Sequence, residues 1–303
     1  MSDEPTMPEA AAPAVEHCYR HPKVETRVHC TRCGRPICPD CMIPAAVGYQ
    51  CPECVREARR AYRVSPARRA RALAATSPTS LMLGVIFVVF IVEIARSGGR
   101  INLTAQGLVD MGAMVPVLVA EGQYWRLVTA MFLHAGLFHI LLNAYALYLF
   151  GPFVEEHFGR RWFLPVYLVS GFLASVASYT FRGLEDVGAV GVGASGAIAG
   201  LLGAFIAFNF RRRHLSLAQG NLRTALMIIL LNAVFGFVVP GVDNAAHLGG
   251  LVAGIAAGTV VEGFGPRGAR TATRWAGLAA LVAIGVVLAV WRTQEIRAAF
   301  GLG

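Results

Sequence analysis

Long apolar runs separated by short polar stretches make up most of the chain from residue 80 onward. Each run approaches the roughly 20 residues that an α-helix needs to cross a bilayer. Seven such runs occur, at about 80–95, 134–154, 162–181, 189–210, 223–240, 244–262 and 274–291. The pattern predicts an all-α polytopic membrane helix bundle, with seven transmembrane helices inside residues 79–292 and a C-terminal tail at 293–303.

The stretch between the first two runs, residues 97–133, has a different pattern. It is only partly apolar, and it contains Pro116 and the adjacent pair Trp125 and Arg126. These interruptions argue against a further span. We expect an interfacial or re-entrant structure on the outer side of the membrane, with the tryptophan and the arginine at the level of the lipid headgroups.

The composition supports a membrane protein. Of the 303 residues, 55% are hydrophobic and 15% are charged, which is unlike an ordinary soluble domain. The net charge is +9, and because Lys23 is the only lysine, nearly all of the positive charge is arginine. Nucleic-acid binding would fit such a balance, but arginines at the ends of apolar runs have a simpler explanation in membrane topology. We therefore expect no nucleic-acid partner.

The clusters of arginine occupy alternate loops, the ones on the side of the N-terminus. They lie at 56–71, at 160–161, at 211–213 with 223, and at 267, 270 and 274. Because loops rich in Arg stay in the cytoplasm, this side is predicted to be cytoplasmic. Residues 1–16 are acidic, rich in Pro and Ala, and without a secretory signal, so we expect disorder there, and residues 57–78 read as a basic linker.

All seven cysteines lie between Cys18 and Cys54, which predicts a separate small domain over residues 17–56. With one histidine they form four pairs of the same spacing: Cys18 and His21, Cys30 and Cys33, Cys38 and Cys41, and Cys51 and Cys54. Eight ligands suit two structural zinc ions, each tetrahedral. Disulfides would need an oxidising compartment and would leave one cysteine unpaired. The neighbouring His17 and His29 are alternative ligands, although surface histidines are the commoner case.

The short loops between these pairs favour an interleaved arrangement. One ion would take Cys18, His21, Cys38 and Cys41, and the other Cys30, Cys33, Cys51 and Cys54. This spacing resembles the B-box type of zinc finger over about 40 residues. The resemblance implies a small interaction module that folds around its metal, because so short a segment lacks a sufficient apolar core. We expect a protein partner for it, and a cytoplasmic position would keep its thiolates reduced.

Four polar side chains stand out at the outer ends of predicted spans: Ser195, His247, His139 and Asn143. Polar groups at membrane depth are costly, and ionisable ones there are candidates for function. The predicted topology places all four at a similar shallow depth. The alternatives are ordinary helix packing for the serine and an interhelical hydrogen-bonded clasp for His139 and Asn143, which share one helix face.

Small residues offer a way for two of these helices to approach closely. They extend the line of each reactive residue, Ala199 and Gly203 after Ser195, and Gly250, Gly254 and Gly258 after His247. We therefore expect Ser195 and His247 to lie within hydrogen-bond reach. An imidazole that takes a serine proton and returns it to a leaving amine is the minimum for nucleophilic catalysis. Asp243 is interpreted as an N-cap, so a dyad is predicted and not a triad.

The same cluster offers hydrogen-bond donors for an oxyanion. His139 and Asn143 supply two side-chain donors, and the backbone N–H of Ser195 supplies a third. Gly193 and Gly196 permit a tight backbone around the serine and a close approach of substrate. Glu93 is the only carboxylate well inside a predicted span, and we interpret it as snorkelling or as a helix contact.

Taken together, these motifs resemble the rhomboid family of intramembrane serine proteases, over about residues 80–292. The matching set is W-R (Trp125, Arg126), H-x4-H-x3-N (His134, His139, Asn143), G-P-x-V-E ending at Glu155, G-x-S-G (Gly193 to Gly196) and A-H-x2-G-x3-G (Ala246 to Gly254). The resemblance implies hydrolysis of peptide bonds in or beside transmembrane segments of membrane proteins, with no catalytic metal. It implies that Ser195 is the nucleophile, His247 the general base, and His139 and Asn143 the oxyanion pair.

The resemblance also implies roles for surrounding segments. Trp125, Arg126, His134 and Glu155 match positions that shape the outer loop and the helix ends. Residues 97–133 correspond to a membrane-embedded loop, and residues 223–240 to a mobile substrate gate. The sequence departs from the family where an aromatic residue often follows the serine by four positions, because Ala199 stands there. Phe235, Phe237 or Tyr145 would then have to support the imidazole.

Two other classes of function fit the sequence less well. A catalytically silent rhomboid-like protein that binds membrane clients usually lacks the serine or the histidine, and both are present here. A transporter would show charged groups near the bilayer midplane and repeated halves, which this sequence lacks. The predicted location is the bacterial plasma membrane, with the N-terminus in the cytoplasm and the active site opening to the outside. The expected partners are transmembrane protein substrates and the lipid bilayer.

Overall fold

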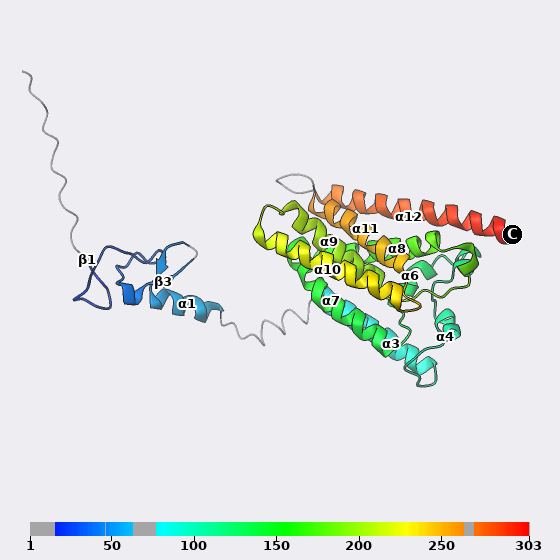
Figure 1. Ribbon diagram of the computed structural model, residues 1–303, viewed down its shortest axis with the longest axis horizontal. Helices are drawn as coiled ribbons and strands as arrows, with labels where there is room; N and C mark the ends of the chain where they lie inside the picture. Colours follow the sequence, from blue (N-terminus) through cyan, green and yellow to red (C-terminus); the bar gives the residue numbers. More distant parts are fainter. Residues whose placement is uncertain (1–15, 46, 63–76, 264–269, 303) are drawn as a thin grey trace, which may run out of the picture. The chain divides into compact units, whose positions relative to one another are not determined.

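The computed structural model describes residues 16–45, 47–62, 77–263 and 270–302 of the chain (Figure 1). It divides into two compact units, Met1–Leu73 and Ala74–Gly303, and each is described by itself. Residues 1–15 of the predicted disordered N-terminus, most of the predicted linker and Arg267 lie outside the described residues, whereas Glu16 is described and is part of a strand.

The first unit has very little regular structure. β1 (Glu16–His17) pairs with β2 (Glu25–Thr26), and β3 (Ile43–Pro44) pairs with β4 (Tyr49–Gln50), both antiparallel. A 3₁₀ turn, η1 (Pro39–Cys41), and a helix, α1 (Pro52–Tyr62), complete it, so the helix continues past the predicted end of the domain at residue 56. The buried centre consists of Ile37 and six of the cysteines. Two-residue strands cannot stabilise a domain by themselves. The stability of this unit must therefore come from its cysteines.

The second unit is a helix bundle. Its long helices are α3 (Pro78–Arg96), α7 (Leu137–Phe158), α8 (Arg160–Phe181), α9 (Ser195–Arg211), α10 (Ser216–Val238), α11 (Asn244–Glu262) and α12 (Thr271–Phe300). Among the described residues, six of them are long and apolar enough to cross a membrane, and α9, with 17 residues, is shorter. The structure thus contains a helix at each predicted apolar run but does not confirm the count of seven spans.

The fourth run begins its helix at Ser195, six residues later than predicted. The preceding residues are extended because they pair with the outer loop. Gly191 and Met114 exchange backbone hydrogen bonds of 2.8 and 3.0 Å, and the N–H of Gly193 donates to the carbonyl of Ala130 at 2.9 Å. Gly193 has a φ of +130°, which only glycine adopts readily. Non-helical backbone is tolerated inside a membrane protein where protein covers it, and here it delivers Ser195 to the first position of α9.

Helix α9 packs against α11 and α8, which also pack against each other, and it contacts α7 and α10 as well. A Cβ added to Gly250 would collide with the carbonyl of Gly196, and a Cβ added to Gly254 with the carbonyl of Gly200. The predicted glycine stripe on α11 therefore does contact α9. On α9, Gly203 of the predicted line also meets α11, since an added Cβ would collide with the carbonyl of Leu251. The residues that face Gly250, Gly254 and Gly258 are Gly196, Gly200 and Ala204, on the neighbouring line of α9, so spacing identified only part of the contact.

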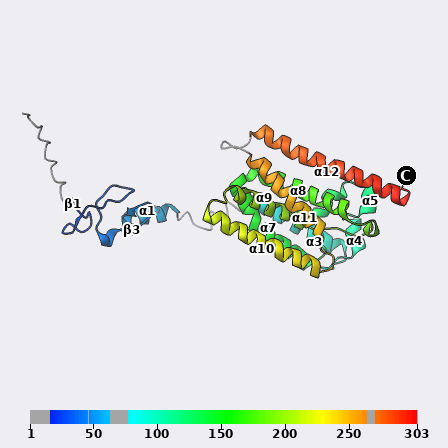
Figure 2. The same ribbon diagram turned by 45° about the horizontal axis from the view of Figure 1, so that its top comes forward.

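Helix α10 packs loosely on the outside of the bundle, mainly against α9 (Figure 2). Only Ala218 and Ala225 of this helix are buried. Most of its large apolar side chains are exposed, with Phe237 at 85%. A helix that exposes apolar side chains on most of its surface has few contacts that hold it in place, apart from surrounding lipid.

The segment between α3 and α7 contains only short helices, as predicted. These are α4 (Ala105–Asp110), α5 (Pro116–Ala120), α6 (Arg126–Thr129) and the 3₁₀ turn η2 (Ala130–Phe132). Arg126, expected at headgroup level, is only 6% exposed, so its side chain points into the protein. Its Nη1 donates to the carbonyls of Val109 and Ala113 at 2.7 and 2.9 Å. Arg126 therefore holds the loop together from inside.

Helix α12 extends to Phe300, so residues 293–300 continue the last helix and do not form the predicted tail. Ile296 is fully buried, and Arg297 Nε donates to the carbonyl of Ala120 in α5 at 2.7 Å. The C-terminal half of α12 is thus packed against the outer loop and the end of α8. A further 3₁₀ turn, η3 (Leu184–Asp186), follows α8.

Candidate active site

Ser195 and His247 meet at the starts of two neighbouring helices. Ser195 is the first residue of α9, and His247 lies in the first turn of α11. The distance from His247 Nε2 to Ser195 Oγ is 2.8 Å, and both side chains are partly exposed. With Nε2 unprotonated, the serine hydroxyl donates this hydrogen bond. This is the geometry in which an imidazole can take the hydroxyl proton.

The close contact of α9 with α11 accounts for this distance. The backbones touch at the glycines described above, and a Cβ on Gly196 would meet the carbonyl of Ala246 at 3.5 Å. Ala246 precedes the histidine, and Gly196 follows the serine. Bulkier residues at these glycines would separate the helices and lengthen the bond between Ser195 and His247.

His139 faces the same serine from the first turn of α7. The backbone N–H of Ala135 donates to its Nδ1 at 3.4 Å, so in the neutral ring the proton is on Nε2. A Cβ added to Gly193 would lie 2.8 Å from His139 Nε2 and 3.6 Å from Ser195 Oγ. The missing side chain of Gly193 therefore leaves open a space that both groups border. A donor and a nucleophile around one small space fit the requirements of an oxyanion site.

Asn143 follows His139 by one helical turn and is 4% exposed. Its Nδ2 has no hydrogen-bond partner among the described residues. An unpaired buried donor costs free energy, so its retention needs an explanation, and a bound oxygen of a substrate would satisfy it. The first N–H groups of α9, including that of Ser195, lack intrahelical acceptors for the ordinary reason that they begin a helix.

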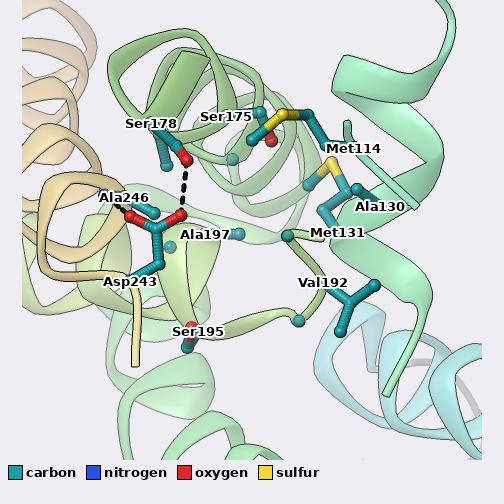
Figure 3. A pocket seen from close by; sticks show the side chains of 15 residues that line it. Met114, Ala130, Met131, Ser175, Ser178, Val192, Ser195, Ala197, Asp243 and Ala246 are labelled. Carbon is teal, nitrogen blue, oxygen red and sulfur yellow. Dashed lines mark hydrogen bonds between the residues drawn. The ribbon is translucent and has the colours of Figure 1, made fainter. Parts of the chain in front are cut away.

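A cavity of about 30 Å³ lies beside Ser195, between α8, α9 and the outer loop (Figure 3). That volume is enough for a water molecule. Its polar lining includes Ser175, Ser178 and Asp243. Water is the second substrate of any hydrolysis, and this cavity offers a place for it next to the hydroxyl.

Asp243 caps α11, as predicted, by accepting a 2.9 Å hydrogen bond from the N–H of Ala246 (Figure 3). Its other oxygen accepts from the Ser178 hydroxyl and, at 2.6 Å, from Arg182 Nη2. Burial raises the pKa of the Asp243 carboxyl, but Arg182 and these hydrogen bonds outweigh burial, so the pKa lies below its ordinary value. Asp243 is therefore a carboxylate at neutral pH.

Glu93 is a residue whose role the sequence did not reveal. It is fully buried, so snorkelling is wrong, and its Oε1 accepts a 3.0 Å hydrogen bond from the N–H of His134. The His134 ring is itself fully buried and lies edge-on to His139, with 5.2 Å between the ring centroids. Glu93 thus supports the turn that carries Ala135, whose N–H sets the tautomer of His139. The only signal in the sequence was a lone carboxylate inside an apolar run.

The remaining motif residues act at helix ends. Glu155 Oε1 accepts from the Ser77 hydroxyl and from the N–H of Thr79, both at 2.6 Å, and so attaches the end of α7 to the start of α3. Trp125 is 50% exposed, and its ring lies 4.6 Å from the guanidinium carbon of Arg126. The contact of Trp125 with Arg126 thus lies in the outer loop and the contacts of Glu155 lie at helix ends, and none of them involves Ser195.

The aromatic ring that was expected to support the imidazole of His247 is not seen. Among the described residues, no aromatic ring contact involves His247. The three candidates Tyr145, Phe235 and Phe237 are 63%, 40% and 85% exposed. Exposure of this size does not fit a ring that is clamped against an imidazole.

The cysteine-rich unit forms two clusters of possible metal ligands. They consist of Cys18, His21, Cys38 and Cys41, and of Cys30, Cys33, Cys51 and Cys54, with all ligand atoms of a cluster within 4.8 Å of one another. This grouping is the predicted interleaved one. All seven cysteines are free of disulfides. His21 Nδ1 points into its cluster, 3.1 Å from Cys38 Sγ and 3.5 Å from Cys41 Sγ.

The donor sets of these clusters fit a tetrahedral thiolate site. The N–H of Cys51 donates to Cys30 Sγ at 3.2 Å, and Arg35 Nε donates to Cys33 Sγ at 3.4 Å, which suits negatively charged sulfur. The other candidate ligands are elsewhere engaged or outside the clusters, since His29 Nε2 contacts Glu16 at 2.5 Å and His17 belongs to neither group. A divalent metal that prefers sulfur and nitrogen ligands fits these residues.

Comparison with known proteins finds a family match within the helical unit. Residues 121–263 match the Rhomboid domain family. The chain is 39% identical to Rhomboid protease GluP of Bacillus subtilis (strain 168) over 171 residues, which is 56% of the chain and 31% of that protein. It is 38% identical to RHOMBOID-like protein 6, mitochondrial, of Arabidopsis thaliana over 55% of the chain and 53% of that protein. It is 35% identical to Putative rhomboid protease YdcA of Bacillus subtilis (strain 168) over 45% of the chain and 66% of that protein.

The similarity is thus to the Rhomboid domain, and two of these relatives are named as rhomboid proteases. The chain spans between about a third and two thirds of the length of these relatives. The family match begins at residue 121 and therefore does not include the cysteine-rich unit.

Proposed function

We propose that the chain is an intramembrane serine protease of the rhomboid type, in which Ser195 is the nucleophile and His247 the general base. The observation that carries the proposal is the 2.8 Å hydrogen bond between Ser195 Oγ and His247 Nε2, made by two residues far apart in the sequence. The substrates are membrane proteins, cleaved in or beside a transmembrane segment.

The reaction begins with attack of Ser195 Oγ on the carbonyl carbon of the scissile peptide bond, while His247 Nε2 takes the hydroxyl proton. The carbonyl oxygen becomes an oxyanion, which accepts hydrogen bonds from His139 Nε2, Asn143 Nδ2 and the N–H of Ser195. The imidazolium returns the proton to the amine nitrogen as the C–N bond breaks. An ester to Ser195 remains on the other product.

Hydrolysis of the ester completes the cycle. A water molecule gives a proton to His247, and its oxygen attacks the ester carbon. The proton then passes to Ser195 Oγ as the ester bond breaks, which frees a carboxylic acid and restores the hydroxyl. The cavity lined by Ser175, Ser178 and Asp243 is a reservoir from which this water enters.

The membrane topology belongs to the same proposal. All seven long helices lie in the membrane, with α9 as a short span whose outer end is completed by the extended residues before Ser195. Because alternate loops carry the arginines, the N-terminus lies in the cytoplasm and the site opens to the outer side of a bacterial plasma membrane. The exposed helix α10 is the element that moves to admit a substrate helix.

The cysteine-rich unit is part of the proposal as a domain of the B-box type with two structural zinc ions. The ligand clusters with donors to sulfur support this assignment. When bound, zinc supplies the cross-links that the two-residue strands cannot provide. The domain binds a protein partner.

The test of the protease is cleavage of a single-span test substrate in detergent. Wild type should cut it, whereas Ser195→Ala and His247→Ala should each lose about 10⁴-fold or more of the rate. Ser216→Ala and His157→Ala, which change the same residue types at exposed positions, are the controls and should cut like wild type. If Ser195→Ala and His247→Ala cut as fast as wild type, the proposal is wrong. If wild type does not cut any substrate offered but binds it, the chain is a catalytically silent client-binding protein.

A further inference from the structure

A network of charged and polar groups connects three helices at the end of the bundle that holds Ser195. Its centre is Asp243, which uses both oxygens. Oδ1 caps the first turn of α11 through Ala246, and Oδ2 accepts from Ser178 in the last turn of α8 (Figure 3). Oδ2 also accepts from Arg182, the residue that follows α8. The Arg182 and Asp243 side chains are 16% and 19% exposed, so solvent screens their ion pair poorly.

The last turn of α8 is in turn attached to α12. Arg292 of α12 is 4% exposed, and its guanidinium donates to the carbonyls of Tyr179 and Arg182. Next to it, the hydroxyls of Thr293 and Tyr179 lie 2.8 Å apart. The carbonyls at the end of α8 would otherwise lack partners, so Arg292 acts as a cap supplied by another helix. Helix α12 therefore contacts Arg182 through Arg292, and Arg182 in turn pairs with Asp243.

The network ends one helical turn from the reacting pair. His247 follows Asp243 by four residues, and its N–H donates to the Asp243 carbonyl at 3.1 Å. Asp243 also lines the cavity that Ser195 lines. Both of its oxygens have partners other than the imidazole, so it does not orient the ring directly. Its effect on His247 must pass through the backbone of the first turn of α11.

We propose that Asp243 and Arg182 are positioning residues for His247, and that α12 braces them through Arg292. The pair fixes the first turn of α11 against α8, so that His247 Nε2 stays within hydrogen-bond distance of Ser195 Oγ. The inference rests on the proposed function of these two residues. It assigns α12 a part in keeping the active site assembled, although no residue of α12 lines the cavity beside Ser195.

The physical basis is the cost of a small displacement. A misplacement of about 1 Å can lower a rate about 100-fold, even when the change lies away from the reacting atoms. A poorly solvated ion pair with two further hydrogen bonds has few alternative geometries, so it defines a helix position more sharply than apolar contacts do.

The experiment compares Asp243→Asn, Arg182→Gln and the double variant with a matched pair at the other end of α11. Asparagine keeps the cap and the shape of Asp243 and removes the charge. The matched control is Arg212→Gln, which breaks the 2.6 Å ion pair between Arg212 and Glu262, the last residue of α11. Kinetic constants are measured on the test substrate, and the rate of Ser195 labelling by a fluorophosphonate reports on the dyad without a substrate.

Each single variant near the site should lower kcat and the labelling rate about 10- to 100-fold, with KM nearly unchanged. The double variant should be no slower than either single one, because one interaction is removed in all three. Arg182→Lys should recover part of the rate. Arg292→Gln, which lies farther from Ser195, should also lower kcat and the labelling rate with KM nearly unchanged, but by a smaller factor. Arg212→Gln should lower thermal stability and leave both rates unchanged.

Two results would overturn the inference. One is a set of Asp243 and Arg182 variants that match Arg212→Gln, with lower thermal stability and unchanged kcat below the unfolding temperature. The other is a double variant that loses the product of the two single effects. Should Asp243→Asn not fold, Arg182→Gln and Arg292→Gln provide the same comparison. Failure of the protease proposal is distinguishable, because wild type and Ser195→Ala would then label and cut alike.

Discussion

The cysteine-rich unit and the helical unit are stabilised in different ways. The first buries Ile37 and six cysteines, with Tyr19, Val28 and Met42 packed against them, and its strands are only two residues long. The second has a large apolar core, and at its centre two helices approach until the backbones of Gly200 and Gly254 touch. On the proposed assignment, metal ligation holds the first unit together, whereas close helix packing holds the second.

This difference determines which changes each unit tolerates. A site made of ligands depends on eight side chains and on spacing along the chain, and most surrounding residues are replaceable. A site made by close helix packing depends on the absence of side chains at a few glycines, at a distance from the reacting atoms. The two units should therefore respond to different perturbations, and this contrast can be tested.

The largest expected effect is that of metal removal on the cysteine-rich unit. Structural zinc contributes about 10–16 kcal/mol in small domains, so a strong chelator added to the full chain should unfold this unit completely. Limited proteolysis before and after chelation measures this, with cleavage expected within residues 16–62. The labelling of Ser195 by a fluorophosphonate should not change. Loss of labelling on chelation would show that the two units do not fold independently.

The opposite perturbation is Gly254→Leu in the helical unit. Its side chain would meet the backbone of Gly200, which cannot move aside, so the loss of stability should exceed the usual ~1–3 kcal/mol of over-packing. Thermal unfolding in detergent and substrate cleavage are the measurements, and cleavage should be lost. Gly84→Leu is the control, because Gly84 is exposed on α3 with no atom within 4 Å of an added Cβ. Equal damage by both variants would contradict a special role for the contact of α9 with α11.

The same contrast explains what could be predicted from the sequence. The ligand pairs of the cysteine-rich unit follow from regular spacing, and the structure groups them as the spacing predicted. The apolar runs identify each long helix for a similar reason, since hydropathy is a local property. The residue at which α9 starts is not determined by the local sequence alone. It depends on the pairing of Gly191 with Met114, about 80 residues earlier in the chain, which no pattern near Ser195 indicates.

Three further differences have the same cause. The predicted line of Ser195 and Gly203 does meet α11, but Gly196 and Gly200 on the neighbouring line of α9 meet it as well, and only the partner helix selects which small residues it contacts. The burial of Arg126 depends on carbonyl groups that the folded loop brings together. The polar network of Asp243, Arg182 and Arg292 draws on three helices, so only its local part, the N-cap, was predictable.

A smaller effect is expected for Asn143→Ala in the proposed oxyanion site. Removal of one oxyanion donor typically lowers kcat about 10²- to 10³-fold. Because Nδ2 has no partner in the resting structure, the variant should leave the thermal unfolding temperature nearly unchanged. Asn232→Ala, an exposed asparagine on α10, is the control. If Asn143→Ala instead lowers stability and leaves kcat unchanged, Asn143 is a packing residue and the clasp between helices is the better interpretation.

The smallest effect should come from a surface ion pair in the cysteine-rich unit. Arg35 Nη1 and Glu53 Oε2 lie 2.7 Å apart, but their side chains are 45% and 46% exposed. Exposed pairs contribute about 0–1 kcal/mol, so Glu53→Gln should hardly change the chelator concentration that releases half of the metal. Cys54→Ser, one position away, should release one of the two ions at much lower chelator concentration, because it removes a ligand. If Glu53→Gln had the larger effect, charge pairing and not metal ligation would hold this unit together, and the contrast with the helical unit would disappear.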